Sequence, residues 1–278
     1  MRLILFVATA IAWLAAAPPV AAQATAWQDL EHAKARLIAA TSAVGTAADV
    51  WLGLQVKLDP EFKTYWRSPG DAGVPPELDW SASRNVAGLT IEWPTPKRYV
   101  LAGFHTFGYA DEVVLPLKVT LVRPGEPVAV RLDLAIGICR DICVLGEASF
   151  KLDLPAGAAT PSPHAAAIER YRARVPGAPQ GIAISAWVAN RPGDVALTVD
   201  AVRDDGPAFG AIDVIVEGLD GVAIPPPHIE RRGAREVAAV YRWPAKDAAH
   251  VVPGRTVVVT LIEAGRGGVE QRVTLGAR

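Results

Sequence analysis

Cys139 and Cys143 are the only thiols in this chain of 278 residues, and three residues separate them. A disulfide between cysteines this close would close a very small loop. The entropy that a disulfide removes from the unfolded chain grows with loop length, so such a bridge adds little stability. In an oxidising compartment the pair could serve as a local clip or as a redox couple that exchanges electrons with other thiols.

Apolar residues recur at every second position on both sides of the pair, over residues 128–138 and again over 144–154. This is the period of half-buried strands, and both cysteines fall in the polar phase. A straight strand would hold the cysteines roughly 13 Å apart at about 3.3 Å per residue. A disulfide needs Cα atoms within about 7 Å, so residues 140–142 must turn or bulge. We expect two antiparallel strands with the pair at or near the hairpin end, because the period-2 flanks argue against a helix.

Two other interpretations of the pair stay open at this point. A structural disulfide could fasten the hairpin, although the polar phase of both cysteines and the small loop argue against it. A tetrahedral zinc site would need two further ligands, and the five histidines of the chain are scattered singly. We therefore expect no metal and no cofactor.

Residues 1–22 have the pattern of a secretory signal peptide, with a basic start at Arg2, an apolar run and small residues before the expected cleavage point. An uncleaved membrane anchor is the alternative, because only one basic residue precedes the run. No later stretch reaches the length of about 18 apolar residues that a membrane-spanning helix needs. We expect a soluble protein of the periplasm, where disulfides form and persist.

The composition indicates a folded protein made mainly of strands. Hydrophobic residues make up 51% of the chain and the net charge is -1, so we expect a packed core and no nucleic-acid partner. Strand-like alternation recurs along the first half of the chain. An irregular segment, rich in Pro, Gly and aromatic residues, is expected over residues 59–79.

The amino-acid composition changes after residue 155, where prolines become frequent, and this change predicts a domain boundary. Residues 156–180 form a Pro-rich linker in which Ser162-Pro163 can start a short helix over residues 164–174. Strand-like runs then recur at short spacing over residues 181–278, which predicts a second β-sandwich domain.

Three separated segments give the chain a resemblance to a known family: residues 63–73, 108–116 and 139–143. In this order they resemble the N-terminal periplasmic domain of DsbD-type disulfide reductases, and in particular its ScsB-like branch, which has three residues between the cysteines. The resemblance implies an immunoglobulin-like domain over residues 23–155. The expected fold is therefore all-β, with two immunoglobulin-like β-sandwich domains. Enterobacterial members have a wider cysteine spacing, so their site geometry does not transfer directly.

The resemblance implies that the cysteine pair takes electrons from a membrane partner and passes them to exported thioredoxin-like proteins. The family's membrane domain and C-terminal thioredoxin domain have no match here, so we expect a separate membrane-embedded electron donor of the DsbD or CcdA kind. By the same resemblance, Cys143 forms the mixed disulfide and Cys139 resolves it. Whether the chain is an enzyme in its own right stays open. The alternative is a non-catalytic binding or chaperone-like module with a structural hairpin disulfide.

An aromatic cap loop shields the pair in that family until a partner docks, and the resemblance places it in residues 98–109. Phe104 and Phe107 are the candidates, because neighbouring glycines could let the loop move. Tyr109 belongs to the same aromatic group. The other interpretation of these rings is that they fill the sandwich core.

Arg140 is the charged residue nearest the pair on the side of Cys139. Its guanidinium could favour a thiolate or contact a docking partner, but the neighbouring Asp141 offsets its field.

Overall fold

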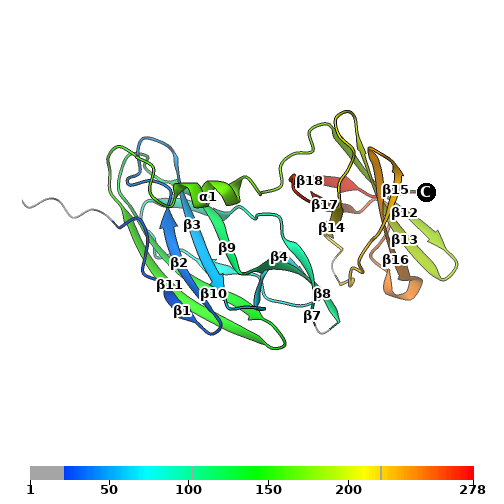
Figure 1. The fold of residues 1–278 in the computed structure, drawn as a ribbon, viewed down its shortest axis with the longest axis horizontal. Coiled ribbons are helices and arrows are strands. Elements are labelled where there is room, and N and C mark those ends of the chain that lie inside the picture. The colour runs from blue at the N-terminus through cyan, green and yellow to red at the C-terminus, as the bar shows by residue number, and fades with distance from the viewer. Residues whose placement is uncertain (1–21, 102, 220) are drawn as a thin grey trace, which may run out of the picture.

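The computed structural model describes residues 22–101, 103–219 and 221–278. Within these residues nearly all regular structure is β-strand, arranged in sheets that form two sandwich-like domains (Figure 1). The expected all-β fold is therefore confirmed. The predicted signal peptide lies outside the described residues, apart from Ala22. No helix in the described part of the chain is long and apolar enough to cross a membrane.

Two antiparallel sheets form the first domain. One has the order β1-β2-β3-β9-β6, with β1 (Gln28–Leu30), β2 (Ala33–Ala39), β3 (Asp49–Leu58), β9 (Glu112–Leu121) and β6 (Val86–Ile91). The other has the order β11-β10-β4-β8-β7, with β5 paired to β10. Its strands are β11 (Cys143–Leu154), β10 (Val128–Cys139), β4 (Lys63–Gly70), β8 (Phe104–Ala110), β7 (Lys97–Leu101) and β5 (Glu77–Asp79). The core lies between the two sheets, where alternate side chains of β3, β9 and β10 are buried.

The second domain also has two sheets and a core of its own. The larger sheet has the order β15-β16-β13-β12-β19, with β15 (His228–Gly233), β16 (Glu236–Pro244), β13 (Asp194–Arg203), β12 (Ile182–Arg191) and β19 (Gly276–Ala277). A 3-10 turn, η1 (Ala245–Asp247), follows β16. The smaller sheet has the order β14-β17-β18, with β14 (Ile212–Glu217), β17 (Thr256–Glu263) and β18 (Gly267–Thr274).

Most strands lie where apolar alternation predicts them. Both strands of the cysteine hairpin are one residue longer than predicted, at the hairpin end. In the second domain the strand-like runs, at residues 181–189, 195–203, 211–217, 236–243, 255–263 and 268–275, correspond to β12, β13, β14, β16, β17 and β18. The sequence analysis missed β15, because this edge strand is largely exposed and polar and so lacks an apolar period.

The irregular segment expected over residues 59–79 is a wrong prediction, because it contains β4 inside a sheet and β5 beside β10. The register between β4 and β8 shifts between Tyr65 and Gly70. The residues between them bulge out of the ladder, which bends the strand and breaks its two-residue period. Trp66 in this bulge is fully buried in the first core. A buried strand therefore looks irregular in the sequence.

The predicted short helix is present as α1 (Ala165–Arg172). Ser162 Oγ accepts the N–H of His164, the N-cap residue, at 2.9 Å and also donates to a backbone carbonyl of β2, so it ties the start of the helix to β2. Ile168 and Tyr171 are buried in the core of the first domain. The helix in the predicted linker therefore packs as part of the first domain.

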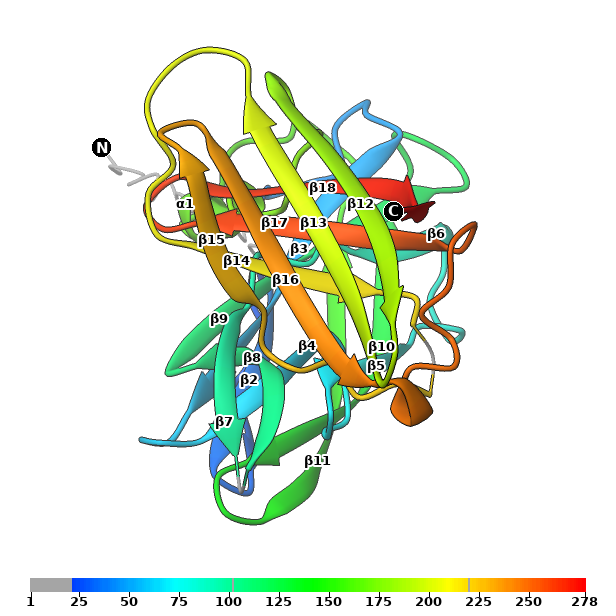
Figure 2. The same cartoon turned by 90° about the vertical axis from the view of Figure 1, so that its right-hand side faces the viewer.

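The two domains meet where β14, β17 and β18 face the first domain (Figures 1 and 2). Arg98 of β7 forms a bidentate ion pair with Asp213 at 3.0 and 2.8 Å and also donates to the carbonyl of Val214. Ile215 and Ile262 of the second domain pack against the core of the first. The interface therefore combines buried apolar contact with directed ion pairs.

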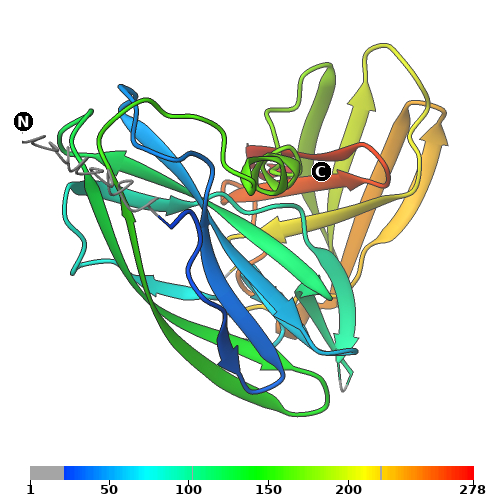
Figure 3. The same ribbon diagram turned by 60° about the vertical axis from the view of Figure 1, so that its left-hand side comes forward.

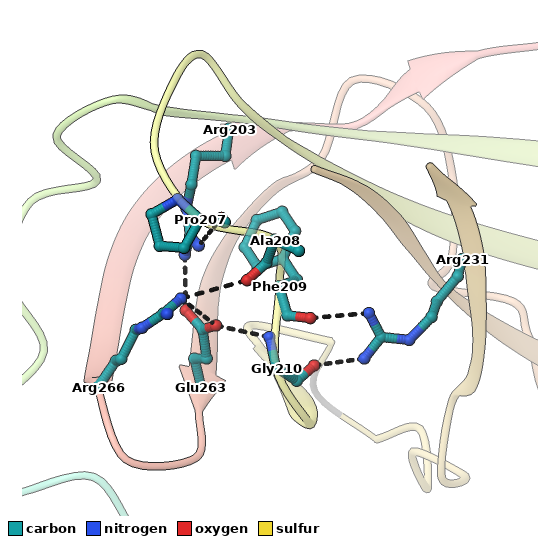
Figure 4. A network of polar contacts seen from close by, with 8 residues as sticks. All are labelled: Arg203, Pro207, Ala208, Phe209, Gly210, Arg231, Glu263 and Arg266. Carbon is teal, nitrogen blue, oxygen red and sulfur yellow. Dashed lines mark hydrogen bonds and ion pairs between the residues drawn. The ribbon is translucent and has the colours of Figure 1, made fainter. Parts of the chain in front are cut away.

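A buried carboxylate, Glu263, fastens the loop between β13 and β14 (Figure 4). It accepts hydrogen bonds from Arg203 at 2.6 Å, from the N–H of Gly210 at 2.7 Å and from Arg266 at 2.9 Å. Arg231 donates to two carbonyls of the same loop. Burial opposes the charge of Glu263, but the hydrogen bonds from Gly210 and Arg203 outweigh it and lower its pKa.

We expect Glu263→Gln to destabilise the protein at pH 7 and to make its stability less sensitive to acid. The folded pKa of Glu263 lies below its unfolded value, so the carboxylate's contribution is complete above about pH 4.5 and is lost as the pH falls through the folded pKa. Gln leaves Arg203 without its counter-charge, which should cost about 2 kcal/mol at pH 7.

Urea unfolding at pH 7 and below pH 4.5 tests this expectation. The difference in unfolding free energy between wild type and variant should shrink in acid. Glu169→Gln is the control, because Glu169 is an exposed partner of Arg172 and should contribute less than about 0.5 kcal/mol. An equal difference at both pH values would contradict the role of the Glu263 charge.

Candidate redox site

Cys139 and Cys143 lie opposite each other at the end of the β10–β11 hairpin and form a disulfide, with Cα atoms 4.1 Å apart. The three residues between them make the turn, in which the N–H of Arg140 bonds to the carbonyl of Ile142 at 3.2 Å. The hairpin-end location and the turn that a disulfide requires at this spacing are therefore confirmed.

The two cysteines differ sharply in exposure. Cys139 is 1% exposed, whereas Cys143 is exposed. The polar phase therefore does not expose Cys139, which is buried although it lies outside the first core. The last four residues of β10 are all buried. β4 pairs with β10 at Ile138 and Cys139, and Tyr65 and Val74 lie against the outward face of β10 at Gly137. An incoming thiolate can reach the sulfur of Cys143, while that of Cys139 is covered.

Tyr65 of β4 places its hydroxyl 3.4 Å from Cys143 Sγ. Burial raises the pKa of Tyr65, so the hydroxyl stays protonated and can donate to the sulfur. The ring lies against Gly73, where a Cβ would approach it to 2.3 Å, and against Gly137. Sequence analysis missed this contact because it joins residues 78 positions apart, and no local pattern marks it.

Charged side chains around the turn neutralise one another. Arg140 Nε donates to Asp141 at 3.0 Å, as the sequence led us to expect, and Arg140 Nη1 lies 3.7 Å from Glu61. Lys63 lies opposite Cys139 in the sheet, but its Nζ donates to the carbonyl of Glu61. Arg140, the neighbour of Cys139 in the chain, is thus already engaged by two carboxylates and contributes little to stabilising a thiolate.

The three aromatic candidates for a cap occupy different environments. Phe107 and Tyr109 are buried in the core, where the Tyr109 hydroxyl donates to the carbonyl of Pro94 at 2.7 Å. Phe104 is 51% exposed, and it lines a cleft of ≈ 610 Å³ together with residues 216–219 and 221–224 of the second domain. The structure therefore places Phe107 and Tyr109 as the core interpretation expects. The cap assignment stays a prediction, with Phe104 as its remaining exposed candidate.

Exposed apolar side chains gather at the end of the first domain that carries the pair. They are Ile142 and Leu145 beside Cys143, and Val100 and Phe104 at the end of the β7–β8 hairpin. The free ends of the β7–β8 and β10–β11 hairpins lie at the same end of this domain in three views (Figures 1, 2 and 3). Large exposed apolar groups gathered in this way are typical of protein interaction sites. We call these four residues the apolar rim.

No group of three or more His, Cys, Asp or Glu side chains suited to a metal ion occurs among the described residues. The chemistry that the arrangement offers is thiol–disulfide exchange at Cys143.

Comparisons with known proteins match the two halves separately. A family model described as the N-terminal part of the thiol:disulfide interchange protein DsbD matches residues 34–155, and a domain family of unknown function matches residues 174–278. The crystal structure of the N-terminal periplasmic domain of ScsB from Proteus mirabilis aligns at 27% identity with a TM-score of 0.73. The alignment covers 91% of this chain and 98% of that chain. No curated protein matches the sequence.

The matched region contains every element of the disulfide hairpin and the strand that carries Tyr65. The structural match extends over both domains, so the second domain is shared with the solved ScsB structure. Residues 34–155 are therefore an N-terminal domain of the DsbD type, and the chain as a whole is similar to the N-terminal periplasmic domain of ScsB.

Proposed function

We propose that this protein is a periplasmic thiol–disulfide relay. It takes two electrons from a membrane-embedded donor of the DsbD or CcdA kind and passes them to exported thioredoxin-like proteins. The observation that carries the proposal is the asymmetry of the disulfide, in which an exposed Cys143 is bonded to a buried Cys139. The periplasmic origin of the similar ScsB domain supports the compartment.

The relay step needs only the two cysteines and a partner disulfide. In the reduced protein, the Cys143 thiolate attacks one partner sulfur, forms a mixed disulfide and expels the other partner sulfur as a thiolate. Cys139 then loses its proton and attacks Cys143 Sγ, which restores the Cys139–Cys143 disulfide and releases the second partner thiolate. Two electrons have moved to the partner, and the donor's dithiol reduces the pair again by the same chemistry.

The surroundings of Cys143 fit this role. The Tyr65 hydroxyl can donate to the sulfur that attacks, and such a hydrogen bond favours the thiolate. The apolar rim gives a partner a surface to cover beside the sulfur, and Arg140 adds a polar contact at its edge.

The reduction potential of the pair tests the proposal. We expect equilibration with glutathione or thioredoxin to give a value less negative than about -300 mV, within reach of thioredoxin-like partners. A more negative potential, with no electron transfer to an oxidised thioredoxin-like protein, would instead support a structural clip in a non-catalytic binding module.

Phe104→Ala is expected to speed reduction of the disulfide by dithiothreitol several-fold while leaving the protein folded, because the family resemblance places the cap loop here and Phe104 is its exposed aromatic residue. Phe107→Ala is the matched comparison. It should destabilise the protein by about 3 kcal/mol or more, because Phe107 is buried in the core. Stopped-flow reduction and thermal unfolding measure the two effects. An unchanged reduction rate in Phe104→Ala would remove Phe104 as the cap.

A further inference from the structure

We propose that the second domain positions the redox site by holding Arg67, an inference that rests on the proposed redox role of the cysteine pair. Arg67 lies in β4, two residues after Tyr65, whose hydroxyl contacts Cys143. The carboxylates that hold Arg67 come from the other domain, from Glu217 in β14 and Glu270 in β18. The strand that touches the reactive sulfur is thus tied directly to the second domain.

The contact is strong and directional. Arg67 donates to both oxygens of Glu217, at 3.0 and 2.7 Å, and its Nη2 also bonds Glu270. Thr260 donates to Glu270 at 3.2 Å and so orients this carboxylate. Burial opposes the charge of Arg67, but the hydrogen bonds to Glu217 and Glu270 outweigh it and raise its pKa. Bidentate pairing of this kind fixes geometry as well as charge.

Arg67 matters for position because β4 bulges at this point. The register with β8 breaks after Tyr65 and resumes at Gly70, so the residues between them lack backbone pairing with β8. Side chains hold the bulge instead. Trp66 is fully buried in the first core, and Arg67 reaches into the second domain. If the two carboxylates lose their charge, Arg67 no longer holds the bulge and Tyr65 can move away from Cys143.

The consequence concerns the reduced protein. A hydroxyl that donates to Cys143 favours its thiolate, so a displaced Tyr65 leaves the Cys143 thiol with a higher pKa. The second domain, which carries no cysteine, would then set the reactivity of a thiol in the first domain.

A double-mutant cycle in the reduced full chain tests the inference. The 13Cβ shift of Cys143 as a function of pH reports its thiolate fraction directly. We expect the paired change Glu217→Gln and Glu270→Gln to lower the thiolate fraction at pH 7 about threefold, and Tyr65→Phe to lower it by a similar factor. In the variant that carries all three substitutions, the thiolate fraction of Cys143 should be no lower than in Tyr65→Phe alone, because the changes act through one contact. If the reductions in thiolate fraction caused by the Glu changes and by Tyr65→Phe instead multiply in the combined variant, the inference is overturned.

Asp213→Asn is the matched control. It removes the carboxylate from the second ion pair of the same interface, which reaches Arg98 in β7 instead of β4. We expect it to leave the Cys143 thiolate fraction unchanged, and a shift as large as that of the Glu variants would mean that any loosening of the interface acts on the thiol. If the Glu variants do not fold, Arg67→Lys, which keeps the charge but loses the bidentate fork, replaces them in the same cycle.

This readout needs no protein partner, so it separates two failures. A wild type that transfers no electrons to an oxidised thioredoxin-like protein would reject the relay, while the cycle still reports on the thiol. If the wild type acts as a relay but the Tyr65 and Glu changes act independently on the thiolate fraction, only the positioning role of the second domain is rejected.

Discussion

Replacing Cys139 with Ser is expected to turn the protein into a trap that accumulates a mixed disulfide with an oxidised, exported thioredoxin-like protein. Cys143 is the exposed sulfur and can attack the partner, while the thiol that would resolve the intermediate is gone. The wild type should accumulate little of this complex, because the free thiol of reduced Cys139 attacks Cys143 Sγ in the mixed disulfide, restores the disulfide seen in the oxidised protein and releases the partner thiolate. Non-reducing electrophoresis and mass spectrometry of the Cys143 peptide measure the trapped fraction.

The reciprocal variant Cys143→Ser is the control. Its remaining thiol at Cys139 is 1% exposed, so it should trap almost none of the same partner. Equal trapping by both variants would contradict the division of roles between the cysteines. The protein with both cysteines replaced by Ser should stay folded, because the loop they close is very short. A loss of several kcal/mol would favour a structural disulfide.

Local patterns in the sequence predicted the hairpin, its turn and the helix, because each depends on residues close together in the chain. Alternation predicts β10 and β11 since one face of the hairpin is covered by the first core along its length. Ser162 marks the helix start because its hydroxyl bonds a backbone N–H two residues away. The three family segments add a fold and a chemistry that alternation alone does not contain.

The surroundings of the sulfur atoms could not be predicted in the same way. Cys139 occupies a polar phase in the sequence, yet β4 covers it from more than seventy positions earlier in the chain. The bulge in β4 destroys the period that would have revealed the strand, and Tyr65, which directly precedes the bulge, contacts Cys143. Arg67 and Arg98 look like ordinary surface residues until a second domain supplies their carboxylates. Each of these features depends on contacts between distant segments.

Gly108→Ala is expected to destabilise the protein strongly. Gly108 pairs with Tyr65 across β8 and β4, and a Cβ at this position would lie 2.0 Å from the carbonyl oxygen of Thr64. The obstacle is backbone, so it cannot rotate away, and the two strands must separate. Overpacking of this kind costs about 3 kcal/mol. The same displacement would carry Tyr65 away from Cys143, which links the stability of β4 to the redox site.

Gly88→Ala in β6 is the control, because a Cβ there meets nothing within 4 Å. It should change the unfolding free energy by less than about 1 kcal/mol. Ala also reduces the conformational freedom of the unfolded chain, which favours the folded state slightly. Urea unfolding compares the two variants, and hydrogen exchange of the β4 amides shows where any loss is located. We expect faster exchange in β4 for Gly108→Ala only. Equal stability of the two variants would mean that β4 and β8 are not packed as closely as the geometry at Gly108 requires, and the contact between Tyr65 and the exposed sulfur would lose its support.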